Sequence, residues 1–202
     1  MTPEPLAQAL ADLADHLRRS TVEVRTGGAG VGSGVIWTDD GLVVTNAHVA
    51  LTDTATLVLA DGRALRGRVT ARDRRRDLAT IAIAGETGVR GLVPATIGHP
   101  STLRTGDLVV ALGNPLGITG ALAVGVVHAL EPERVGRPRW IRADIRLAPG
   151  NSGGPLADAR GRVIGVNAMI VNGLGIAVPV TTVARFLSDA GFRQDSTGWR
   201  AA

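Results

Sequence analysis

From residue 20 to residue 178 the chain is a succession of short apolar runs separated by turn sequences. The runs start at intervals of roughly 8–15 residues, and turns such as Asp61-Gly62 and Asn172-Gly173 end them. We interpret the following runs as strands: 21–25, 30–38, 41–45, 54–60, 64–71, 78–84, 95–97, 107–113, 120–130, 139–143, 156–157, 163–170 and 175–178. About a dozen short strands predict an all-β fold of antiparallel barrels or a sandwich, and they argue against alternating βαβ units.

An amphipathic helix is predicted on each side of this β-rich region. The first covers about residues 4–19, because leucines recur on one face at positions 6, 10, 13 and 17. We expect it to pack on the domain, with an oligomer contact or a regulatory arm as the alternative. The second helix opens at Pro179 and stops at Gly191. Residues 191–202 form a tail, which is predicted to be frayed from Arg193 to Ala202.

The composition excludes several classes of protein. The 202 residues include no Cys, which rules out a disulfide scaffold, a thiol nucleophile and a cysteine zinc site. The sequence shows no metal-ligand cluster, and we expect neither a metal nor a cofactor. All 22 basic residues are Arg, and the net charge is only +4. The pI near 11.2 mainly reflects the missing Cys and Tyr, so we expect no nucleic-acid partner.

The hydropathy pattern contains no run of about 20 apolar residues, the length that a membrane span requires. The first 20 residues carry dispersed charges and do not resemble a secretory signal. We therefore expect a cytoplasmic protein without a membrane partner, with a trimmed form of an exported protein as the alternative.

The strongest candidate for chemistry is Ser152, in the segment 148–155 with the sequence APGNSGGP. A Ser among glycines lies in a turn that other groups can approach closely. Glycines at 150 and 153 allow backbone N–H groups to reach a reacting atom without obstruction from a Cβ. Such N–H groups form an oxyanion hole beside the nucleophile of acyl-transfer enzymes. The alternative reading is an ordinary Gly-rich turn.

A serine nucleophile needs a base, and His48 is the best candidate. It follows the apolar run 43–45 in a short helical turn, which would hold the imidazole rigidly at the mouth of a barrel. The other three histidines have plainer environments on the first helix, before a Pro, and near the end of an apolar strand: His16, His99 and His128.

The imidazole in turn needs a carboxylate on Nδ1. Asp77 directly precedes the apolar strand 78–84, a position that favours partial burial. The competitor is Asp73, but its neighbours at 72 and 74–76 are all Arg, which is typical of a solvated turn. We therefore predict Asp77 as the partner of His48.

The order His48, Asp77, Ser152 is that of the two-barrel serine proteases. The sequences around them resemble the three catalytic blocks of the HtrA (Deg) branch of trypsin-like proteases: TNAHV at 45–49, DLA at 77–79 and GNSGGP at 150–155. Three further segments resemble a first Gly-rich strand, an inter-barrel turn and a closing segment of that family: GVGSGVI at 30–36, GNPLG at 113–117 and GIAVP at 175–179.

The resemblance implies two perpendicular six-stranded antiparallel barrels, with a triad in the cleft between them. It covers about residues 20–190, the expected protease domain. We expect the barrels at about residues 20–90 and 91–178, a closing helix at 179–190, the first helix within residues 1–19, and the tail at 191–202.

The resemblance also implies the residue roles. Ser152 would attack the scissile carbonyl, His48 would accept its proton, and Asp77 would hold the imidazole tautomer. The N–H groups of Gly150 and Ser152 would form the oxyanion hole. Asn151 cannot pair with a newly cut N-terminus as an Asp would, so we expect activity without zymogen cleavage. Control is instead expected from loop order around residues 114–120 and 131–150 or from oligomerisation.

By the same resemblance, the primary substrate pocket is lined by the segment preceding Ser152 and the strand after it, represented by Leu147, Asn167, Ala168 and Met169. These side chains are mostly apolar, and no acid is positioned to hold a Lys or Arg. We expect cleavage after small or medium aliphatic residues. Arg146 would further disfavour basic side chains if it pointed inward.

The sequence thus predicts a serine endopeptidase that acts on protein or peptide substrates. The chain differs from the usual family pattern, because the stretch after the closing helix is too short for a PDZ domain. A homo-oligomer through the first helix remains open. Two other functions also remain open, namely an inactive or gated binding module with the protease fold and an esterase that uses the same triad.

Overall fold

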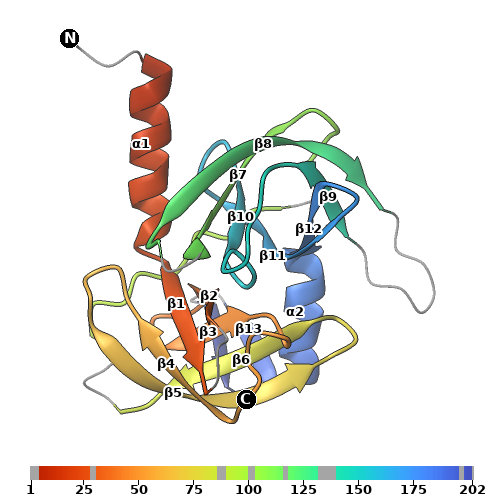
Figure 1. Ribbon diagram of the computed structural model, residues 1–202. Helices are drawn as coiled ribbons and strands as arrows, with labels where there is room; N and C mark the ends of the chain where they lie inside the picture. The colour runs from red at the N-terminus through yellow and green to blue at the C-terminus, as the bar shows by residue number, and fades with distance from the viewer. Residues whose placement is uncertain are drawn as a thin grey trace.

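The computed structural model describes residues 5–27, 31–85, 90–99, 103–115, 118–131, 140–195 and 198–201 (Figure 1). Its first half is a closed antiparallel barrel with the strand order β1-β2-β3-β6-β5-β4. The six strands are β1 (Thr21–Thr26), β2 (Val31–Ile36), β3 (Leu42–Thr45), β4 (Thr54–Val58), β5 (Ala64–Asp73) and β6 (Leu78–Ile83). Their apolar residues largely point inward, because side chains alternate between the two faces of a strand.

The second half is another closed six-stranded barrel, with the order β10-β11-β12-β9-β8-β7. Its strands are β7 (Leu108–Gly113), β8 (Ala121–Leu130), β9 (Ile141–Asp144), β10 (Pro155–Asp158), β11 (Val163–Val171) and β12 (Leu174–Pro179). The prediction of two six-stranded antiparallel barrels flanked by helices is confirmed.

One predicted strand is not formed. Residues 95–97 make only an isolated parallel bridge, from Ile97 to Val163. The segment instead links the two barrels, because Ala95 N–H donates to the Ile36 carbonyl at 2.9 Å and Gly98 N–H donates to the Val163 carbonyl at 2.8 Å. Three residues, Ala95, Thr96 and Ile97, are too short a run to distinguish this crossing from a strand.

Helix α1 (Pro5–Arg18) stands out from the barrels and reaches them only at its C-terminal end (Figure 1). Leu17 is buried there, whereas Leu6 near the other end is 68% exposed. Among the described residues no helix is both long and apolar enough to cross a bilayer.

Helix α2 (Val180–Asp189) packs against the barrels through its apolar side, and Val183 and Phe186 are buried. After it, β13 (Phe192–Asp195) pairs with β14 (Gly198–Ala201) in a hairpin. The prediction of a frayed tail is therefore wrong for these residues. The partly buried Phe192, packed on the core, anchors the hairpin.

The core falls into three apolar clusters. One fills the first barrel, around Leu57 and Ile81, and one fills the second, around Leu156 and Ile164. The third joins the barrels to each other and to both helices, and includes Leu112 and Leu187. Each large side chain buried in this way stabilises the fold by roughly 1.5–3 kcal/mol. The third cluster therefore fixes the two barrels relative to each other, and with them the residues at their boundary.

Candidate active site

His48 lies in a single helical turn that follows β3. The Asn46 carbonyl accepts the N–H groups of Val49 at 3.2 Å and Ala50 at 3.1 Å, which closes the turn. The His48 side chain is 49% exposed, so its ring remains accessible at the barrel boundary. The placement agrees with the helical turn expected from the sequence.

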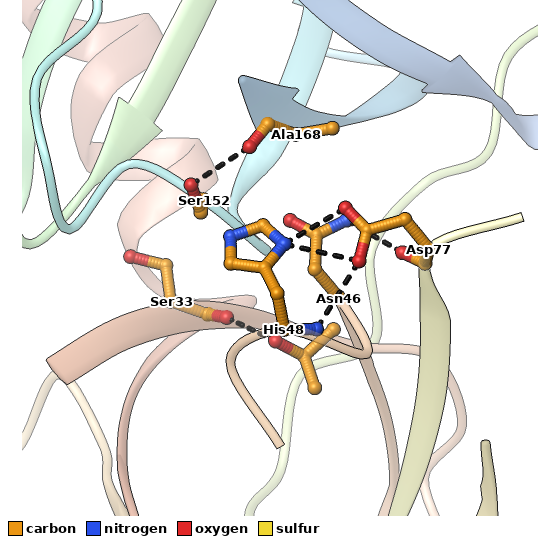
Figure 2. A network of polar contacts seen from close by, with 7 residues as sticks. Ser33, Asn46, His48, Asp77, Ser152 and Ala168 are labelled. Atoms are coloured by element: carbon orange, nitrogen blue, oxygen red, sulfur yellow. Dashed lines mark hydrogen bonds and ion pairs between the residues drawn. The ribbon is translucent and has the colours of Figure 1, made fainter. Parts of the chain in front are cut away.

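Asp77, at the start of β6, faces His48 (Figure 2). The Nδ1 atom of His48 lies 2.8 Å from Oδ2 and 3.0 Å from Oδ1 of Asp77, and the His48 backbone N–H donates to Oδ1 at 3.1 Å. The side chain of Asp77 is only 14% exposed. A carboxylate held on Nδ1 fixes the tautomer in which Nε2 is free to accept a proton.

The backbone at Asp77 is held in an unusual conformation. Its φ of +54° is left-handed, which is uncommon outside glycine. Asn46 stabilises it, because its Nδ2 donates to the Asp77 carbonyl at 2.9 Å. Asp73 plays a different part and accepts the N–H groups of Arg75 and Arg76 in the turn before β6. The structure thus brings Asp77, and not Asp73, to the imidazole.

Ser152 comes from the second barrel, in the loop that precedes β10. Its Oγ donates to the Ala168 carbonyl at 2.9 Å (Figure 2). Within the described residues no hydrogen bond joins Ser152 to His48. The three predicted side chains therefore gather at one place, but the serine hydroxyl is turned toward β11 and away from the imidazole.

The loop around Ser152 is seated directly on the first barrel. Ser33 of β2 donates its backbone N–H to the Ser152 carbonyl at 2.8 Å. Gly153, with φ +85°, lies so close that a Cβ there would overlap the Ser33 carbonyl oxygen. Gly150 has φ +104°, and a Cβ on it would lie 2.5 Å from the Asn114 carbonyl oxygen. Both positions require glycine, for conformation and for space.

The two N–H groups predicted for the oxyanion hole belong to Gly150 and Ser152. In the part of the chain that the structure describes, neither donates a hydrogen bond to another group. Free N–H groups beside a serine hydroxyl can donate hydrogen bonds to a developing negative charge. The geometry is therefore compatible with the predicted use of both groups.

A pocket of about 290 Å³ opens beside Ser152. All four residues predicted to bind the substrate side chain line it: Leu147, Asn167, Ala168 and Met169. Asn167 is almost fully buried, and its Nδ2 donates to the Pro155 carbonyl at 2.8 Å, so its amide also supports the wall. Arg146 does not line this pocket and borders a separate hollow with Asp144.

The residues that brace the site do not stand out in the sequence. Ser33 and Asn46 hold backbone carbonyls of the Ser152 and Asp77 segments, and Asn114 donates its backbone N–H to the Ser33 hydroxyl. Arg72 donates to the Ala50 carbonyl at 2.8 Å and steadies the chain beyond His48. The sequence feature that could have identified them is a small polar residue inside an apolar or Gly-rich segment. An unpaired polar group buried there would be costly, so such a residue is expected to form hydrogen bonds. Residues 116–117 and 132–139 of the two loops predicted to exert control lie outside the described residues.

Comparisons with known proteins agree with this geometry. A family model described as a trypsin-like peptidase domain matches residues 32–166. HhoB from a Synechocystis species, named as a serine protease, is 41% identical over 163 residues, which are 76% of this chain and 38% of HhoB. The mitochondrial serine protease HTRA2 of Drosophila pseudoobscura pseudoobscura is 39% identical over 81% of this chain and 40% of its own length. The chain thus spans about two fifths of these relatives.

A solved structure extends the likeness over nearly the whole chain. The crystal structure of Deg5 matches with a TM-score of 0.81 and 32% identity, over 92% of this chain and 95% of that chain. Sequence blocks, barrel topology and the grouping of His48, Asp77 and Ser152 all lead to the same assignment. The chain belongs to the trypsin-like peptidases and, within them, to the HtrA family of serine proteases.

Proposed function

We propose that the chain is a serine endopeptidase in which Ser152 is the nucleophile, His48 the general base and Asp77 the orienting carboxylate. The observation that carries the proposal is the His48–Asp77 pair, joined at 2.8 Å and located where the Ser152 loop meets the first barrel. Its catalytic unit is proposed to comprise residues 20–190, with barrels at about 20–90 and 91–178.

The reaction requires one movement of the serine side chain. Rotation of Ser152 about χ1 would exchange the Ala168 carbonyl for Nε2 of His48, which would accept the hydroxyl proton as Oγ attacks the scissile carbonyl. The resulting imidazolium is stabilised by Asp77 and later gives its proton to the leaving amine. Water then hydrolyses the acyl-enzyme by the same steps in reverse.

The developing oxyanion would be received by the N–H groups of Gly150 and Ser152. Because both groups belong to the fixed backbone, they need no reorganisation during the reaction. Asn151 lies between them and is 5% exposed. A neutral amide at this buried position offers no ion pair to a newly formed N-terminus, which supports activity without zymogen cleavage.

The strand β11 supports a peptide as the substrate. A bulge between Asn167 and Met169 leaves Ala168 out of register with β12, and β10 pairs with β11 only as far as Val166. Asn167 is still bonded on that side, because its carbonyl accepts the Gly153 N–H at 2.8 Å and its own N–H donates to the Gly154 carbonyl at 2.8 Å. From Ala168 onward β11 therefore has an edge that an extended peptide can join, beside Ser152. An esterase would have no use for such an edge.

The adjoining pocket supports a preference for small or medium aliphatic side chains at the cleaved position. It holds about 290 Å³, and the residues that line it include no charged side chain. A charged substrate group would lose its hydration there without gaining a counter-ion. A peptide-library cleavage profile should show Val, Ala or Leu enriched before the cleaved bond, whereas enrichment of Arg or Lys would contradict the preference.

Replacement of the nucleophile tests the central claim. Ser152→Ala should lower peptide turnover by roughly 10⁶-fold, because members of a triad act as a unit. A fluorophosphonate should label the wild-type chain and not this variant. Ser188→Ala, which changes an exposed serine in α2, is the matched control and should be labelled normally. Undiminished casein cleavage by the Ser152→Ala protein would overturn the assignment.

A gated binding module is the second candidate, since Ser152 bonds Ala168 and not His48. The endopeptidase and the binding module differ in whether Ser152 reacts with a bound peptide. Peptide substrates should be hydrolysed with a Ser152-dependent rate if the side chain rotates freely. Stable peptide binding with no turnover of peptide or ester would favour the binding module.

A further inference from the structure

Ser33 is a fully buried serine in the second strand of the first barrel. Its Oγ donates to the Gly150 carbonyl at 2.7 Å and accepts the Asn114 backbone N–H at 2.9 Å. The Asn114 side-chain Nδ2 also lies 3.3 Å from this oxygen. One hydroxyl therefore connects β2, the loop after β7 and the Ser152 loop.

The direction of these bonds is determined by Asn114. Both of its nitrogens are donors, so the Ser33 oxygen must act as their acceptor. The hydroxyl proton is then free to point only at the Gly150 carbonyl. The Asn114 side chain is fixed in turn, because its Oδ1 accepts the Gly120 N–H at 3.0 Å.

The peptide between Gly150 and Asn151 is consequently held on both sides. Ser33 holds its carbonyl, and the Asn151 N–H donates to the Ala148 carbonyl at 3.0 Å. This matters because Gly150 has no side chain and could adopt many other backbone conformations. Fixing this peptide fixes the residue whose own N–H is proposed for the oxyanion hole.

We propose that Ser33 is a positioning residue for the oxyanion hole, acting through the Gly150 carbonyl. The inference rests on the proposed function, since it assigns a cause to the geometry of that same site. Among the described residues the Ser33 hydroxyl makes no hydrogen bond to Ser152 Oγ. Its effect should therefore appear in the transition state, where the oxyanion forms, and not in substrate affinity.

The test compares kcat and KM for Ser33→Ala on a peptide substrate. The variant keeps the Cβ and loses only the hydroxyl, which leaves the Gly150 carbonyl and the Asn114 N–H without their partner. We expect kcat to fall about 10- to 100-fold, somewhat less than the loss of an oxyanion donor itself, with KM within about twofold of the wild type. The affinity for a peptide boronic acid, which forms a tetrahedral adduct, should fall in parallel with kcat/KM.

Two further variants separate positioning from general damage. Ser20→Ala removes another buried serine hydroxyl, which donates to the Leu17 carbonyl at 3.1 Å, and should leave kcat and KM unchanged. Ser33→Cys retains a weak donor and acceptor at the γ position. Its kcat should lie between those of the wild type and Ser33→Ala. This order can be measured at a temperature where circular dichroism shows that all the proteins are folded.

The outcomes can be distinguished from a failure of the proposed function. If Ser152→Ala abolishes turnover while folded Ser33→Ala retains the wild-type kcat, the positioning role is wrong and the endopeptidase remains. A change in KM alone, or a Ser33→Cys variant no better than Ser33→Ala, would also overturn the role. If Ser33→Ala does not fold at any temperature, the kcat of folded Ser33→Cys is compared with that of the wild type. A lower kcat supports the positioning role, and an unchanged kcat overturns it.

Discussion

The two barrels supply their parts of the proposed active site in different ways. His48 and Asp77 both belong to the first barrel, on segments flanking β3 and β6, which pair directly through Thr45 and Ala79. Among the described residues, the hydrogen bonds given for His48 and Asp77 all join groups of that barrel. Ser152 belongs to the second barrel, yet its loop is held by Ser33 of the first, and its hydroxyl points to a carbonyl of its own barrel.

The proposed acid–base pair, His48 and Asp77, is therefore fixed, whereas the proposed nucleophile, Ser152, can adjust its side chain. The His48–Asp77 geometry is built into one sheet and should persist wherever the first barrel is folded. The Ser152 geometry depends on the boundary between barrels, and its last adjustment is a rotation of one small side chain. Ser152 is partly exposed, and rotation of a small side chain is fast where solvent reaches it, so substrate binding can select the productive rotamer.

The largest effect that probes the fixed pair is expected from Asp77→Asn. The amide keeps the size of the side chain but can donate to Nδ1, which would favour the wrong imidazole tautomer. We expect kcat to fall by about 10⁴-fold with little change in KM. Steady-state kinetics on a peptide substrate measures this. Asp73→Asn, four residues away in the turn, is the control and should retain full kcat. An equal loss of kcat in both variants would mean that the His48–Asp77 contact has no particular role in the reaction.

Most of the fold and the site could be predicted from sequence because both depend on local signals. Apolar runs with turn residues predicted the strands, and the position of Asp77 before an apolar strand distinguished it from Asp73. The tail hairpin escaped prediction because it depends on the packing of Phe192 against distant residues. The orientation of Ser152 escaped because a rotamer depends on the carbonyl that tertiary structure brings near it.

The bracing role of Ser33 escaped for a further reason. The segment GVGSGVI is rich in glycine, which indicates tight packing. A serine there can be explained by its small size alone, so the sequence does not point to a role for its hydroxyl. Its importance lies in three hydrogen bonds to two residues, Asn114 and Gly150, that are 81 and 117 positions along the chain. Sequence spacing carries no record of such contacts.

The next largest effect concerns the seating of the nucleophile loop on the first barrel. Gly153→Ala would place a Cβ into the Ser33 carbonyl and near the Thr45 hydroxyl, at a left-handed φ. We expect a loss of about 4 kcal/mol or more in the free energy of unfolding, among the largest single-residue effects. Denaturant unfolding measures it. Gly173→Ala has a similar φ of +81° but open space around it, and should cost only about 1–2 kcal/mol. Equal losses of unfolding free energy in the two variants would show that the left-handed φ alone, and not the contact between the barrels, accounts for the destabilisation.

A smaller effect distinguishes the cluster between the barrels from the core inside one barrel. Leu112 and Leu57 are both fully buried, the first between the barrels and the second within the first barrel. Either Leu→Ala change should destabilise the fold by about 3 kcal/mol, from lost burial and a residual cavity. Only Leu112→Ala should also lower kcat in the folded protein, because it loosens the boundary on which Ser152 depends. Kinetics and thermal unfolding on the same samples test this, and an unchanged kcat in folded Leu112→Ala would remove the distinction.

The smallest effect concerns substrate selectivity and the two pockets beside the proposed catalytic residues, one on each barrel. The one beside Ser152 has apolar walls that include Leu147, whereas the one beside His48, of about 310 Å³, includes Leu51 and two arginines. If the second barrel alone selects the residue before the cleaved bond, Leu147→Ala should enlarge its pocket and raise the kcat/KM ratio for Phe over Val by about tenfold. Leu51→Ala should leave that ratio unchanged, because the first barrel would contact residues on the other side of the bond. A peptide pair differing only at the cleaved position measures the ratio. A shift caused by Leu51→Ala would show that both barrels share in selecting that residue, and the division between a fixed acid–base half and a substrate-selecting half would no longer hold.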